Sequence, residues 1–136
     1  VDHEAQAAIE LEMLADTKER GEYRFEIVEG TPIVIDPSPI IPQILHDIEL
    51  GFSPATISAR FHNTVLGWTL EVCRRLRDKT GINKVALSGG VFQNRYLLER
   101  IKPQLEKEKF VVIRHSKVPS NDGGISIGQA LIANTR

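Results

Sequence analysis

The sequence predicts an α/β fold, with a mixed β-sheet flanked by helices, and two observations support this prediction. In the second half of the chain, short apolar runs at residues 84–87 and 110–113 alternate with helical patterns. Strands that alternate with helices favour parallel pairing through right-handed crossovers. In the first half, residues 23–27 alternate apolar and polar side chains, and residues 33–35 follow a glycine turn, which indicates an antiparallel hairpin.

Apolar periodicity and residues that start or stop helices predict five helices. Ser53 and Pro54 suit the start of the longest one, and Gly81 suits its end. Pro103 is expected to kink or break the fourth. The two apolar strands are expected to be fully buried, as in a parallel sheet covered on both faces. The predicted helices are residues 5–14, 40–50, 54 to the basic stretch before 81, 91–107 and 125–133.

The amino-acid composition limits the classes of protein to which the chain could belong. The chain has 136 residues, of which 41% are hydrophobic and 26% charged, with a formal net charge of -1, which fits one ordinary domain. The balanced charge argues against nucleic acid or acidic membranes as partners, and no apolar run could span a membrane. The chain opens inside a helical pattern, so we expect residues 1–136 to be part of a larger protein. The single cysteine, Cys73, favours a reducing, cytoplasmic setting and is expected to be a half-buried helix residue.

The first candidate site is the turn Ser88-Gly89-Gly90, which follows a predicted strand and precedes a predicted helix. Two glycines allow positive φ angles and the close approach of a ligand, and a helix N-terminus offers free N–H groups to an anion. Ser88 adds a hydroxyl, and Asn94 adds an amide that can donate and accept. The alternative is a tight turn in which Ser88 caps the helix, and on local sequence alone the two interpretations are equally good.

The second candidate site is Asp122, which follows the other predicted strand and begins the turn Asp122-Gly123-Gly124. Its carboxylate could cap the next helix or bind a cation beside a phosphate. Because the ends of parallel strands meet at one sheet edge, the two glycine turns together predict a nucleotide and metal site. No two of the four histidines have the helical spacing of metal ligands, and His62 is expected to be a packing or surface residue.

At this point the sequence resembles a known family. The segments 85–94 and 121–130, together with 4–12 and 60–64, closely resemble the C-terminal end of the hydrogenase maturation carbamoyltransferase, the HypF family. The resemblance implies one lobe of an actin-like, sugar-kinase-like (ribonuclease H-like) fold. Residues 1–136 would be the C-terminal lobe of the carbamoyltransferase domain.

The resemblance also implies an enzyme. The whole protein would use carbamoyl phosphate and ATP to make carbamoyl-adenylate. It would then transfer the carbamoyl group to the C-terminal cysteine of a partner protein, for the cyanide ligand of nickel–iron hydrogenase. A divalent metal, iron or zinc, would assist the transfer, with magnesium accompanying ATP. The histidine pair that binds the metal in the family belongs to the first lobe, so the isolated chain is expected to be inactive.

Residue by residue, the resemblance places Gly89, Gly90 and Asn94 at the nucleotide, with Ser88 beside them. Asp122 would be a metal ligand. Glu10 would stand where related transferases have a ribose-contacting glutamate, with Gln6 as a second candidate on the same helix. Ala5 stands where the family usually has glycine.

Two alternatives remain. One is a lobe of a tRNA threonylcarbamoyl transferase, which the run 92–94 and the two glycines after Asp122 disfavour. The other is a non-catalytic module that binds a nucleotide or docks a partner.

Overall fold

The structure is a computed structural model that describes residues 2–135. The order of its elements is the predicted one: helix, two strands, two helices, strand, helix, strand, helix. The elements are α1 (Gln6–Leu14), β1 (Glu26–Val28), β2 (Val34–Asp36), α2 (Ile40–Glu49), α3 (Pro54–Thr80), β3 (Lys84–Leu87), α4 (Arg95–Lys107), β4 (Val111–Arg114) and α5 (Ile125–Asn134), with short 3-10 turns η1 (Gly90–Gln93) and η2 (Asp122–Gly124). The α/β class is therefore confirmed.

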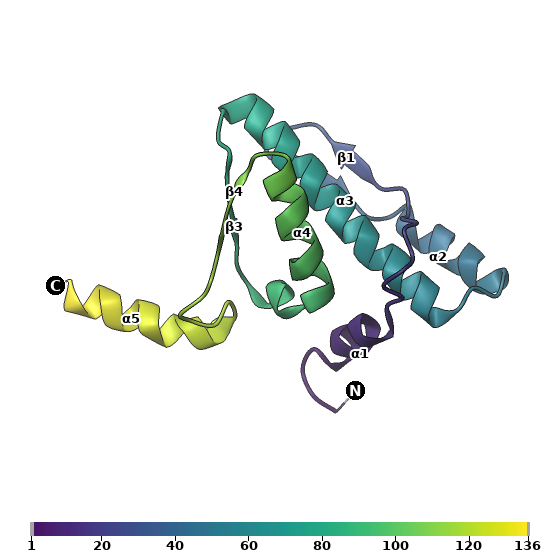
Figure 1. Ribbon diagram of the computed structural model, residues 1–136, viewed down its shortest axis with the longest axis horizontal. Helices are drawn as coiled ribbons and strands as arrows, with labels where there is room; N and C mark the ends of the chain where they lie inside the picture. Colours follow the sequence, from purple (N-terminus) through teal and green to yellow (C-terminus); the bar gives the residue numbers. More distant parts are fainter. Residues whose placement is uncertain (1, 136) are drawn as a thin grey trace.

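Helix α3 is the central element of the fold. The Ser53 hydroxyl accepts a hydrogen bond from the Thr56 N–H at 3.1 Å, which satisfies one free donor of the first turn. At the other end, Gly81 adopts a φ of 71° and its N–H donates to the Arg77 carbonyl at 2.7 Å. Both predicted helix boundaries are confirmed. Figure 1 shows β1 and α2 on one side of α3, and α4 with β3 and β4 on the other.

The strands form two separate two-stranded sheets. β1 and β2 pair antiparallel, with Ile27 opposite Ile35, and β3 and β4 pair parallel, with Val85 opposite Val112. The parallel pairing and the hairpin are confirmed, but the single mixed sheet is wrong. The reason is visible in Figure 1, where α3 lies between the hairpin and the parallel pair, so their edges do not meet.

The parallel strands are half-buried, which corrects the prediction that they are fully buried. Leu87 is buried and Val85 and Val112 are partly buried against the core, whereas Val111 is 50% and Ile113 52% exposed. Inward and outward side chains alternate, as on a sheet covered on one face. Helices α3 and α4 cover that face, and the described residues leave the other face open.

Helix α4 passes through Pro103 and continues to Lys107, so the predicted break is absent. Pro103 is exposed, and water can therefore bond the Glu99 carbonyl that lacks its usual N–H partner. The inner face of the helix is as predicted. Its buried residues are Tyr96, Leu97, Ile101 and Leu105.

The core lies between α3 and α4. Cys73 packs partly buried against it, as predicted, and burial raises the pKa of its thiol, which makes it a poor nucleophile. The buried core residues are Ala59, Leu66, Leu70, Leu87, Tyr96, Leu97, Ile101, Leu105 and Phe110.

Helix α5 stands apart from this core. No residue of α5 is buried, and Figure 1 shows it extending away from the other helices. Its exposed apolar side chains include Ile125, Ile127, Leu131 and Ile132. None of the helices in residues 2–135 has the length and apolar content needed to cross a bilayer.

Candidate functional site

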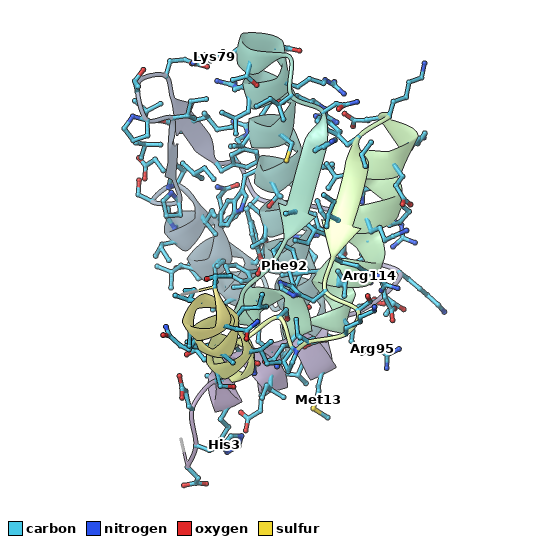
Figure 2. The ribbon with its side chains drawn as sticks, turned by 90° about the vertical axis from the view of Figure 1, so that its left-hand side faces the viewer. His3, Met13, Lys79, Phe92, Arg95 and Arg114 are labelled. Atoms are coloured by element: carbon cyan, nitrogen blue, oxygen red, sulfur yellow. The ribbon has the colours of Figure 1, made fainter. Side chains whose placement is uncertain are left out.

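The two glycine turns lie next to each other at the carboxyl ends of β3 and β4. The Gly89 N–H donates to the Ser120 carbonyl at 2.8 Å, and the Ser88 hydroxyl lies 2.8 Å from Nε2 of His115. In Figure 2 both strands point toward the same end of the molecule, near Phe92 and Arg114. The sequence-based prediction that one sheet edge brings the turns together is confirmed; what they bind stays a prediction.

The two glycines of the first turn have different reasons to be glycine. Gly89 has a φ of 94°, a conformation that side chains rarely adopt. Gly90 has no such angle, and a Cβ added there would meet no atom within 4 Å. Neither backbone conformation nor packing within the described residues therefore requires glycine at 90. Open space in front of this residue suits the close approach of a ligand.

The α-helix does not begin directly after the turn, which corrects the predicted helix start at residue 91. Asn94 is extended, and α4 begins at Arg95. Oε1 of Glu12, from α1, accepts hydrogen bonds from the N–H groups of Arg95 at 2.7 Å and Tyr96 at 3.3 Å. The negative charge favoured by this helix N-terminus is thus supplied by the protein itself. The α4 terminus is not open to a phosphate.

Backbone N–H groups that could bind an anion lie earlier in the chain than α4, at the start of η1. A 3-10 helix leaves its first N–H groups without partners inside the helix. Here these belong to Gly90 and Val91, and no bond to another backbone group in residues 2–135 engages them. The exposed Ser88 lies on the same turn. An anion would therefore meet two backbone N–H groups beside the Ser88 hydroxyl, which also contacts His115.

Asn94 is held at both ends of its amide. Its Oδ1 accepts from the Leu97 N–H at 2.9 Å, so Asn94, rather than Ser88, caps α4. Its Nδ2 lies 3.0 Å from Nε2 of His62, which is 2% exposed. His62 is thus a packing histidine, as predicted. Its contact with Asn94 was missed, although a buried histidine always needs polar partners.

Asp122 is exposed at the start of η2. Asn121 caps this turn through its Oδ1, which accepts from the Gly123 N–H at 3.1 Å. The Asp122 carboxylate is therefore not needed as a cap and could bind a cation. Residues 2–135 hold no group of three or more His, Cys, Asp or Glu side chains able to bind a metal ion. They would contribute one carboxylate to a metal site.

Gln6 and Glu10 lie one turn apart on α1, where Gln6 is partly buried and Glu10 is exposed. Nε2 of Gln6 donates to Oε1 of Glu10 at 2.8 Å. Glu12 connects this helix to the start of α4, and Figure 2 shows α1 at the end of the molecule toward which β3 and β4 point. The ribose contact expected for Gln6 and Glu10 stays a prediction.

A groove of about 780 Å³ lies elsewhere, between β1 and helices α3 and α4. Two of its arginines, Arg74 and Arg75, form ion pairs with Glu71. None of the predicted site residues lines it. Because these two arginines are already paired and the groove contains neither glycine turn, we regard it as a contact region between elements.

The fold and the paired glycine turns place the chain in the class of carbamoyltransferases with a Kae1-like domain. Residues 1–129 match the family described as "Carbamoyltransferase, Kae1-like Domain, second subdomain". The chain belongs to the HypF family, and its α/β architecture is part of the actin-like fold of that domain.

Solved and curated relatives agree. A crystal structure of full-length HypF "in the phosphate- and nucleotide-bound form" superposes with a TM-score of 0.92 and 51% identity, over 99% of this chain and 18% of that one. The crystal structure of T. kodakarensis HypF superposes with a TM-score of 0.72 and 26% identity, over 98% of this chain and 17% of that one. Carbamoyltransferase HypF of Rhodobacter capsulatus is 33% identical over 96% of this chain and 16% of its own length. The chain thus spans about a sixth of these relatives.

Proposed function

We propose that the protein containing these residues transfers a carbamoyl group from carbamoyl phosphate, by way of carbamoyl-adenylate, to the C-terminal cysteine of a partner protein. This transfer would serve cyanide-ligand synthesis in nickel–iron hydrogenase maturation, in the cytoplasm. The chain supplies part of the nucleotide and metal site. The observation that best supports this role is the Gly89–Ser120 hydrogen bond, which joins the two glycine turns.

The adenylate phosphate is the group that this edge suits best. The N–H groups of Gly90 and Val91 would donate to its oxygens. The Ser88 hydroxyl would do the same while it accepts from Nε2–H of His115. Fixed donors stabilise developing negative charge without reorganising, and here that charge would be the leaving adenylate. Gln6 and Glu10 would contact the ribose from α1. Apart from Gln6, which is partly buried, each of these contacts uses a group that is exposed in the structure or open at the start of η1.

Asp122 would supply one ligand to a divalent metal, iron or zinc, completed by residues outside this chain. Such a metal, when bound, polarises the mixed anhydride and neutralises the leaving phosphate. The fit rests on the exposed carboxylate, which the turn does not use for capping. Magnesium would accompany ATP itself.

Calorimetric titration of ATP into the 136-residue chain tests the nucleotide role. Gly90→Ala should fold normally, because the added methyl meets no atom within 4 Å, yet lose about tenfold or more in affinity as it enters the ligand space. Gly128→Ala is the matched control: it also adds a methyl in open space, but on α5, and should bind as the wild type. Equal affinity for all three proteins would contradict the proposed role of the turn, and no binding by any of them would favour a non-catalytic docking module.

A further inference from the structure

His62 lies directly behind Asn94, the residue that follows η1 and caps α4. It comes from α3, is 2% exposed, and its ring lies 5.1 Å from the ring of Tyr96 on α4. Its Nδ1 is 2.8 Å from the Ser58 carbonyl oxygen, and its Nε2 is 3.0 Å from Nδ2 of Asn94. The imidazole therefore bridges the backbone of α3 and the side chain that caps α4.

These contacts fix which nitrogen of His62 holds the proton. A carbonyl oxygen can only accept, so Nδ1 must donate to Ser58. In the neutral ring Nε2 is then an acceptor, and Asn94 must present its NH₂ group to it. Turning the amide over would set Oδ1 against an acceptor and NH₂ against the Leu97 N–H. In the flipped orientation neither of these two contacts is a hydrogen bond, so the orientation described above is favoured.

We infer that His62 is a positioning residue for the nucleotide site, acting through the amide of Asn94. With Oδ1 bound to Leu97 and one Nδ2 proton bound to His62, the amide presents its second Nδ2 proton to a ligand. Asn94 therefore acts as a donor, and the atom that it meets is an acceptor, such as a phosphate oxygen. This inference rests on the proposed nucleotide role of Asn94.

The orientation is testable without a ligand or a variant. In the ¹⁵N-labelled chain, NMR should show His62 as the neutral Nδ1–H tautomer, with a scalar coupling across the hydrogen bond from Asn94 Nδ2 to His62 Nε2. A proton on Nε2, or an Asn94 amide that flips freely, would overturn the inference even if nucleotide binds at the turn.

The functional test uses the full-length protein that contains this chain and its cysteine-ending partner. Asn94→Ala and His62→Phe should each slow carbamoyl transfer by about ten- to a hundredfold, the loss expected for one hydrogen bond to a charged group. His62→Gln retains an amide oxygen near the position of Nε2 and should restore most of the rate. His46→Phe, which removes the exposed histidine of α2, should transfer at the wild-type rate.

The outcomes distinguish the positioning role of His62 from the proposed nucleotide role of the turn. If Asn94→Ala is impaired but a folded His62→Phe is not, the positioning role is wrong and the proposed function stands. If both variants transfer normally, the nucleotide role of this turn is wrong as well. If His62→Phe does not fold, His62→Gln decides, because a folded His62→Gln protein that is as slow as Asn94→Ala would contradict positioning through the acceptor.

Discussion

At the scale of single residues, buried polar side chains organise this small fold. The Tyr23 hydroxyl donates to Oδ2 of Asp47 at 2.9 Å, and Nη1 of Arg60 donates to the same oxygen at 2.8 Å. The Tyr23 N–H donates to Oγ1 of Thr64 at 2.8 Å. This network connects the segment before β1 to α2 and α3. Burial, followed by the hydrogen bond to Asp47, raises the pKa of Tyr23 well above its ordinary value.

The raised pKa predicts a loss of stability in alkali. Because the unfolded chain releases the Tyr23 proton at lower pH than the folded one, the contribution is complete below about pH 10 and declines above it. Urea unfolding between about pH 8 and 11 should show this decline. Tyr23→Phe should reduce this decline. Tyr96 and Cys73, whose pKa values burial also raises, should account for what remains. An unchanged alkaline slope in Tyr23→Phe would show that this phenol is not the group responsible.

At the scale of elements, local signals were predictable and long-range partners were not. Ser53 and Gly81 mark the ends of α3 because capping depends on neighbouring residues. The separation of the two sheets depends on where α3 lies, which no local pattern encodes. The partners of Glu12 and His62 lie 83 and 32 residues away in the chain. The candidate site was predictable because parallel strands place their ends at one edge, whereas its supporting contacts were not.

Among the contacts between elements, the hydrogen bonds of Glu12 have the clearest consequence for stability. Its carboxylate satisfies two N–H groups at the start of α4, and removal of such a cap costs about 1 kcal/mol. Glu12→Ala should therefore lower the free energy of unfolding by this amount. It should also speed amide hydrogen exchange across α1, which has no buried residue. Glu4→Ala, an exposed change before the same helix, is the control; if both variants behave alike, Glu12 does not hold α1.

At the scale of the whole molecule, we compare the length of the chain and its metal ligands with what catalysis would need. The chain spans about a sixth of its HypF relatives, and a metal site would need ligands besides Asp122. We therefore expect the purified 136-residue chain to fold without catalysing carbamoyl transfer. Carbamoyl-phosphate-dependent ATP turnover by this chain alone, measured as released pyrophosphate, would contradict that expectation.

We propose that the joined glycine turns bind an adenine nucleotide. This can be measured by titrating ATP into the ¹⁵N-labelled chain and following the amide chemical shifts. If the turns bind the nucleotide, shifts should cluster at residues 88–94 and 119–124, and adenosine, which lacks the phosphates, should cause smaller shifts. Shifts confined to the groove around Arg74 and Arg100, or no shifts at all, would contradict it.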